Sequence, residues 1–139
     1  MIKKILFVLA LNLILVGCAT MSTDSQTCPP QPVKACTGDP QAPTIKLNTK
    51  NGKLKATPYC AKANPGTVLV FRLTPPGNKA KNVVEIKPKN IADAWLAGKN
   101  DDYQDLILIE VPADLKPGDY NYGIKTDTDC VDPRIHVEN

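Results

Sequence analysis

The side chains best suited to chemistry lie near the end of the chain, where Asp127, Asp129 and Asp132 precede the only histidine, His136. Carboxylates at this density can coordinate Ca²⁺, and a histidine can act as a general base or a metal ligand. However, the glycine and terminal glutamate of an EF-hand loop are absent, and aspartate favours turns because its side chain hydrogen-bonds its own backbone. We therefore predict a turn at residues 127–129 and a surface position for His136. A ligand or metal site formed by Asp127, Asp129 and His136 is the alternative.

An apolar segment near the N-terminus ends at a cysteine. Lys3 and Lys4 precede it, residues 5–16 are apolar except for Asn12, and it closes with Leu15-Val16-Gly17-Cys18. This run is too short to cross a bilayer, which needs about 20 helical residues, but it fits the hydrophobic region of a signal peptide. The segment resembles the lipobox of bacterial lipoproteins.

That resemblance implies a signal peptide over residues 1–17, diacylglycerol on the sulfur of Cys18, cleavage before Cys18, and acylation of the new N-terminus with a fatty acid such as palmitate. Several acyl chains are needed for lasting attachment, because one chain binds a membrane only marginally. Ala19, rather than an aspartate, follows the cysteine, which resembles an outer-membrane address. We expect a lipid-anchored protein of the bacterial outer membrane that faces the periplasm.

Four further cysteines remain, namely Cys28, Cys36, Cys60 and Cys130. An exported chain with four spare cysteines typically forms two disulfides, and three pairings are open. We predict Cys28–Cys36 and Cys60–Cys130, because the first pair is local to a Pro-rich segment and the second would tie an early strand to the last hairpin. No zinc site is expected, because no two cysteines have the C-x2-C spacing that is typical of zinc ligands.

Charge is spread unevenly along a nearly neutral chain. Cleavage before Cys18 removes two of the 17 basic side chains, which leaves 15 against 14 acidic ones and a net charge of +1. This balance gives no reason to expect nucleic-acid binding. Residues 42–99 nevertheless carry eleven basic and two acidic side chains, whereas residues 100–139 carry three basic and ten acidic ones.

The asymmetry has three interpretations. It can mark a basic face for an anionic partner such as lipopolysaccharide. Alternatively, the two halves pair strand against strand and their charges neutralise across the sheet. Lysines can also protect an edge strand against unwanted pairing.

The 122 residues of the mature chain are enough for one domain. Residues 18–41 are rich in Ser, Thr and Pro and hold few large apolar side chains, so they cannot offset the entropy of ordering and are predicted to form a tether. From residue 42 to residue 139, short apolar segments alternate with turn signals, which is typical of an all-β sandwich.

Particular segments support this architecture. Asn51-Gly52 fits a type I′ turn between two strands whose apolar residues alternate with polar ones. Residues 67–74 and 106–109 are apolar at almost every position, which predicts a central strand and a second strand covered on both faces. With about seven strands and one short helix, we expect a Greek-key antiparallel β-sandwich.

One segment has the pattern of a helix. Asn90 can cap its start and Gly98 can close its end. Ile91 and Trp95 are four residues apart and would face the core together. We expect Trp95 to cover one end of the sandwich, and stacking on a ligand is the alternative use of this ring.

Three segments are similar to cupredoxin-like domains. These are Pro65 to Phe71, Leu115 to Tyr122 with its Pro-Gly-x-Tyr-x-Tyr pattern, and Cys130 to Ile135. Tyr120 also follows a corner that resembles the tyrosine corner of Greek-key sandwiches, in which the hydroxyl bonds back to the upstream backbone. The resemblance implies a cupredoxin-like or immunoglobulin-like sandwich.

The copper ligands of that family are not matched. A cupredoxin site uses two histidines and a thiolate with a weak axial ligand. This chain has His136 alone, Met1 and Met21 both precede the domain, and Cys130 is predicted to form a disulfide. We therefore expect no metal and no cofactor.

No catalytic motif is present. The chain contains no Gly-x-Ser-x-Gly, no phosphate-binding glycine loop and no His-Glu-x-x-His. We predict a non-enzymatic binding or assembly module that is held at the membrane by its acyl chains and meets an envelope protein or an anionic envelope polymer. A ligand- or metal-binding cupredoxin-like protein and a purely structural envelope lipoprotein are the alternatives.

Overall fold

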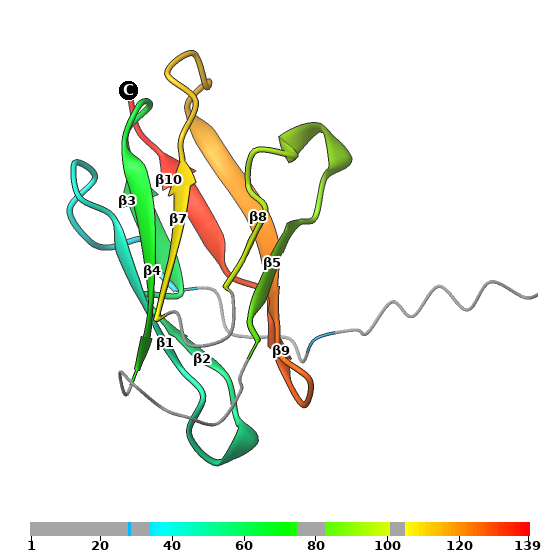
Figure 1. Ribbon diagram of the computed structural model, residues 1–139. Coiled ribbons are helices and arrows are strands. Elements are labelled where there is room, and N and C mark those ends of the chain that lie inside the picture. The colour runs from blue at the N-terminus through cyan, green and yellow to red at the C-terminus, as the bar shows by residue number, and fades with distance from the viewer. Residues whose placement is uncertain (1–27, 29–33, 75–82, 101–104) are drawn as a thin grey trace, which may run out of the picture.

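Two β-sheets pack face to face in the computed structural model, which describes residues 28, 34–74, 83–100 and 105–139 (Figure 1). The all-β sandwich that the strand and turn pattern predicts is therefore confirmed. The signal peptide, Cys18 and most of the predicted tether lie outside the described residues. The described residues contain no helix with the length and apolar character needed to cross a membrane.

The first sheet has four strands in the order β2-β1-β4-β7. Their bounds are β1 Thr44–Asn48, β2 Lys55–Thr57, β4 Val68–Thr74 and β7 Leu106–Glu110. Side chains alternate between buried and exposed along β1, β2 and β7, because successive side chains of a strand point to opposite faces of the sheet. Asn51 and Gly52 both have positive φ, at 59° and 70°, as the predicted turn requires. The tight two-residue hairpin is not formed, because Asn48 pairs with Lys55 and the 3-10 helix η1 (Lys50–Gly52) lies between the strands.

The second sheet follows the order β3-β10-β8-β5-β6, with β9 paired to β8. Its strands are β3 Cys60–Ala63, β5 Glu85–Pro88, β6 Gly98–Lys99, β8 Gly118–Lys125, β9 Cys130–Val131 and β10 Arg134–Val137.

Both sheets contain parallel as well as antiparallel strand pairs. The prediction of an entirely antiparallel sandwich is therefore wrong. β1 runs parallel to β4, and β3 runs parallel to β10. The chain leaves the first sheet after β2, forms β3 in the second sheet, and returns as β4 beside β1. Such a crossover connection permits parallel neighbours, whereas a tight hairpin permits only antiparallel ones.

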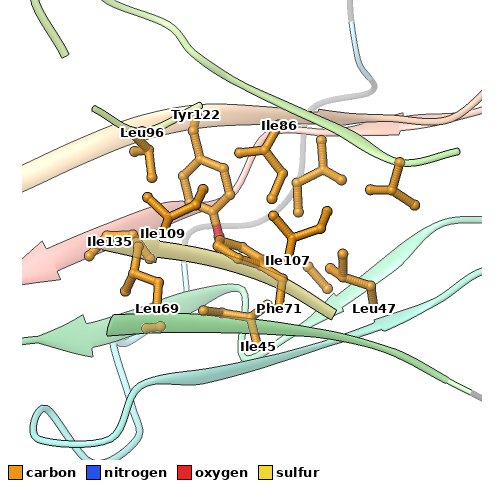
Figure 2. Packing of buried hydrophobic residues seen from close by; sticks show 14 of the residues in the cluster. Ile45, Leu47, Leu69, Phe71, Ile86, Leu96, Ile107, Ile109, Tyr122 and Ile135 are labelled. Carbon is orange, nitrogen blue, oxygen red and sulfur yellow. The ribbon is translucent and has the colours of Figure 1, made fainter. Parts of the chain in front are cut away.

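Aromatic and aliphatic side chains from both sheets fill the space between them (Figure 2). Phe71 of β4 and Tyr122 of β8 meet edge to face, with their ring centroids 5.8 Å apart. The other large side chains without solvent exposure include Ile45, Leu47, Leu69, Leu96, Ile124 and Ile135. Each such side chain stabilises the fold by roughly 1.5–3 kcal/mol relative to an exposed position.

The tyrosine corner is confirmed. The Tyr120 hydroxyl donates a hydrogen bond to the carbonyl oxygen of Lys116 at 2.6 Å. The Tyr120 ring meets Trp95 edge to face at 5.6 Å, and Trp95 packs against the core cluster. Trp95 therefore covers the core beside the tyrosine corner, as expected for a structural role.

The predicted helix from Asn90 to Gly98 is wrong. Only a 3-10 helix, η2, forms at Ile91–Asp93, although Asn90 does cap it by accepting a hydrogen bond from the Ala92 N–H at 3.1 Å. Ile91 is 93% exposed and does not face the core. Gly98 lies in β6, where an added Cβ would come within 2.8 Å of Ile107, so the close approach of β6 to β7 leaves no room for a side chain at this position.

The prediction that residues 106–109 form a strand covered on both faces is also wrong. β7 is the last described strand of its sheet, and it buries only Ile107 and Ile109. Leu106 and Leu108 face outward and are 42% and 63% exposed. An apolar run cannot distinguish a strand covered on both faces from an edge strand with an apolar outer face.

The two disulfides are present, but the predicted pairing is wrong. Cys28 bonds to Cys130, and Cys36 bonds to Cys60. Thr37 forms a parallel bridge with Ala61: its N–H donates to the Cys60 carbonyl at 2.9 Å, and its carbonyl accepts from the Lys62 N–H at 3.1 Å. This added strand segment brings Cys36 beside Cys60, so the non-local pairing follows from backbone contacts that the sequence does not reveal.

Peptide mapping under non-reducing conditions tests the pairing. Trypsin cleaves after lysine and arginine, so Cys36, Cys60 and Cys130 fall in three peptides, 35–46, 56–62 and 126–134. We expect mass spectrometry to find 35–46 linked to 56–62, with the link lost after reduction. A link between 56–62 and 126–134 would contradict the structure.

Two Tyr→Phe variants test the tyrosine corner. Tyr120→Phe removes the hydrogen bond to Lys116 and should lower the free energy of unfolding by about 1 kcal/mol. Tyr122→Phe is the matched control, because the buried Tyr122 hydroxyl has no hydrogen-bond partner among the described residues. Burial also raises the pKa of this hydroxyl far above its usual value.

Removing a buried, unsatisfied hydroxyl relieves a desolvation cost of about 1–3 kcal/mol, so Tyr122→Phe should leave stability unchanged or raise it. Urea unfolding followed by the fluorescence of Trp95 measures both variants. Equal losses in the two variants would rule out a specific role for the Tyr120 hydroxyl.

Candidate functional site

The outer surface of the four-stranded sheet carries a cluster of positive charge. We define the basic face as four residues: Lys46 of β1, Lys53 just before β2, Lys55 of β2, and Arg72 of β4. All four residues are exposed. Each is adjacent to a buried inward residue, such as Leu54 or Phe71, so the alternation along the strands fixes these side chains on the outside.

The register places two of these cations next to each other. Lys46 lies directly opposite Arg72 across the β1–β4 pair. Like charges directly opposite each other in a sheet are destabilising, and neighbouring strands are only about 4.8 Å apart. Among the described residues, no carboxylate forms an ion pair with any member of the basic face.

The second sheet behaves differently. Lys62 pairs with Glu138 at 2.7 Å, and Lys89 pairs with Asp132 at 2.7 Å, so each pair joins the basic half of the sequence to its acidic half. Among the residues that the structure describes, neutralisation between the two halves is therefore found in the six-stranded sheet only. Edge protection can account for Lys53 and Lys55 beside the edge strand β2, but not for Lys46 and Arg72 on inner strands.

His136 lies in a small ionic cluster on the outer face of the six-stranded sheet. Its Nδ1 is 2.7 Å from Asp119 Oδ1, and Arg134 Nη1 is 3.6 Å from Asp119 Oδ2. Arg134 also donates to the carbonyl of Lys34 at 3.2 Å and contacts the sulfur of Cys60. The cluster therefore attaches the segment before Cys36 to the sheet.

A metal is not supported at this cluster. Candidate ligand atoms of Cys36, Asp119 and His136 all lie within 4.8 Å of one another. However, the Cys36 sulfur is bonded to Cys60, so it offers no thiolate. Two remaining ligands fall short of the three or more protein ligands that zinc sites use.

Asp129 in the last turn serves the backbone through its carboxylate, as the turn interpretation predicts. Asp129 Oδ2 accepts a hydrogen bond from the Leu54 N–H at 2.8 Å, and its Oδ1 accepts from the Cys130 N–H at 2.9 Å. Asp132 pairs with Lys89, and its carbonyl accepts a hydrogen bond from the Tyr59 hydroxyl.

The alternative site of Asp127, Asp129 and His136 is not assembled. His136 lies opposite Asp119 near the start of β8, whereas Asp127 and Asp129 follow the other end of that strand. The β8–β10 register that separates them, and that creates the Asp119–His136 pair, is not visible in the spacing of the residues along the chain.

The copper ligands of a cupredoxin are likewise not assembled by the described residues. His136 is the single histidine, Cys130 is bonded to Cys28, and Met1 and Met21 lie outside the described residues. The donor set therefore does not fit a blue-copper centre.

Comparison with solved structures finds cupredoxins. One is the Cu-containing nitrite reductase from Thermus scotoductus, with 14% identity and a TM-score of 0.47; the match covers 80% of this chain and 25% of the reductase. Another is auracyanin B, with 13% identity and a TM-score of 0.38, covering 74% of this chain and 94% of that protein. This chain thus spans a quarter of the reductase. Since both TM-scores are below 0.5, the fold class rests on the strand order and pairing described above.

No protein-family model matches the sequence, and no curated protein matches it significantly.

Proposed function

We propose that this chain is an outer-membrane-anchored lipoprotein whose sandwich acts as a non-enzymatic binding module for an anionic envelope polymer. The observation that carries the proposal is the basic face, where Lys46 and Arg72 are adjacent and unpaired among the described residues. A phosphate-rich polysaccharide such as lipopolysaccharide would relieve the repulsion between these cations, since a Lys or Arg near an anionic surface contributes about 1 kcal/mol.

The position of the two disulfides supports a basic face that points away from the lipid anchor. Cys60 lies opposite Arg134, and Cys130 lies opposite Lys125. Their neighbours Ala61 and Val131 belong to the core cluster, so both cysteines are on the outer face of the six-stranded sheet. The chain that leads to the lipid is thus attached to the face opposite the basic face, which leaves the basic face accessible away from its own anchor.

The lipobox and the tether complete the mechanism. Acyl chains on Cys18 hold one end at the membrane, the segment before Cys28 gives reach, and a rigid sheet presents the cations. The metal-handling alternative has no comparable support, because its three residues lie apart. A purely structural lipoprotein is the outcome that the binding experiment below would favour if the basic face makes no difference.

Charge reversal tests the basic face. Lys46→Glu combined with Lys55→Glu should weaken binding of the acylated chain to immobilised lipopolysaccharide by about tenfold or more, since each removed cation contributes about 1 kcal/mol. Binding of the unaltered chain should also fall with added salt. Biolayer interferometry in a neutral detergent measures both effects.

The matched control is Lys116→Glu combined with Lys125→Glu. Both lysines are exposed and lie outside the basic face, so net charge changes by the same amount while the basic face is kept. An equal loss in both double variants would show that only net charge matters. Unchanged binding in the Lys46 and Lys55 variant would reject this face.

Two substitutions at the predicted lipobox test the anchor. Cys18→Ser removes the sulfur that would carry diacylglycerol, so the chain should disappear from the outer-membrane fraction and lose its acyl mass in mass spectrometry. Ala19→Asp keeps the acylated cysteine and should instead redirect the protein to the inner membrane. An unacylated wild-type chain, or an outer-membrane Cys18→Ser chain, would contradict lipid anchoring.

A further inference from the structure

An exposed apolar strip runs along one edge of the four-stranded sheet. Leu106 and Leu108 of β7 are 42% and 63% exposed, and Val68 of the neighbouring strand β4 is 45% exposed. Leu106 lies opposite Arg72, and Glu110 lies opposite Val68. Beside the strip, an open groove between β6 and β7 is lined by Gly98, Lys99 and residues 105–108. Exposed apolar side chains that adjoin one another can mark an interaction site.

The backbone of β7 is open on the same side. The Leu73 N–H donates to the Asp105 carbonyl at 2.8 Å, and the Val111 N–H donates to the Thr67 carbonyl at 2.8 Å. Because hydrogen bonding alternates along an antiparallel pair, the odd-numbered residues of β7 bond to β4. The N–H and C=O groups of Leu106, Leu108 and Glu110 then point away from β4, and no described strand pairs with them.

The two edges of this sheet are built differently. The opposite edge strand, β2, has three residues and carries Lys55, with Lys53 just before it. Short, lysine-bearing edges resist pairing with another chain. β7 has five residues, Leu-Ile-Leu-Ile-Glu, with neither lysine nor proline. One edge is protected against strand addition and the other is suited to it.

We infer that β7 pairs antiparallel with β7 of a second copy of this chain, so that the two four-stranded sheets join into one. Residues directly opposite each other in such a pair share a face of the sheet. The buried faces of both copies stay aligned only when outward residues meet outward residues. Centring the pair on Leu108 satisfies this and uses all three free backbone positions. Leu108 then meets Leu108 of the second copy, and Leu106 meets its Glu110.

Charge complementarity favours this register. Arg72 lies beside Leu106 in the same cross-strand row, and Glu110 of the second copy falls on the other side of Leu106. The two long, oppositely charged side chains therefore flank one leucine on the outer surface. Neither Arg72 nor Glu110 has an ion-pair partner among the described residues. The two-fold axis repeats the arrangement, so each dimer contains this row twice.

The dimer does not depend on the proposed polymer binding, but it is compatible with it. A two-fold axis perpendicular to the joined sheet keeps both outer faces on one side. Two basic faces would then lie on the same side of the joined sheet, separated by the two β7 strands. Both lipid attachments would be on the opposite side, where one membrane could hold them.

Crosslinking in intact cells tests the pairing on the full chain. Hydrogen-bonded antiparallel residues have Cα atoms about 5.5 Å apart, which is within the range for a disulfide. Leu108→Cys should therefore give a disulfide-linked homodimer on a non-reducing gel. Ile91→Cys is the matched control, because Ile91 is an exposed apolar residue away from β7, and it should remain monomeric.

Charge exchange tests the register. In the Leu108→Cys chain, Arg72→Glu should cause loss of the crosslinked dimer, and Arg72→Glu with Glu110→Arg should restore it. For the chain without the added cysteine, sedimentation in neutral detergent should show twice the protomer mass, and Leu108→Lys should halve it. A monomeric Leu108→Cys chain, a crosslink to a different protein, equal dimer from Ile91→Cys, or a double exchange that fails to restore the dimer would each overturn this inference.

Discussion

Burial of one side of every strand is the constraint on which the rest of this molecule depends. Phe71 and Tyr122 meet edge to face between the sheets, and aliphatic residues on either side are withdrawn from water. Because the side-chain period of a strand is two, a shift of one residue would turn each buried set outward. The packing therefore decides which residues are left on the surface, including Lys46 and Arg72.

The same constraint explains how charge is sorted. Cations and carboxylates from distant parts of the chain meet across the six-stranded sheet, as Lys62 and Glu138 do. In the four-stranded sheet, β1 lies between β2 and β4, and all three strands come from the basic half of the sequence. Parallel pairing of β1 with β4 thus brings Lys46 against Arg72 and leaves no acidic strand between them. Strand order, rather than composition, creates the basic face.

Local signals in the sequence predicted local structure well. The positive φ of Asn51 and Gly52, the Asn90 cap and the Tyr120 corner each depend on a few neighbouring residues, and all three are present. The all-β sandwich followed from alternating apolar residues. What failed depended on distant neighbours: the crossover that makes β1 and β4 parallel, and the bridge from Thr37 to Ala61 that sets the disulfide pairing. The apolar pattern of β7 could not reveal that its outer face is uncovered.

For the candidate site, the charge asymmetry of the sequence left three interpretations open: a basic face, neutralisation across the sheet, and protection of an edge strand. The ion pairs separate these interpretations, because Lys62 and Lys89 have acidic partners whereas Lys46 has none in the part of the chain that the structure describes. His136 shows the same limit, because its partner, Asp119, is brought to it by the pairing of β8 with β10.

The disulfide between Cys28 and Cys130 also has a mechanical consequence. Any pull applied at the N-terminus enters the fold through a covalent bond at β9, about one hundred residues further along the chain. This entry point lies after β1, β2, β4 and β7, which are the four strands of the sheet that carries the cations. A domain attached in this way is held by its six-stranded sheet, so a pull on the anchor acts first on that sheet and reaches the strands that carry the cations only through the core.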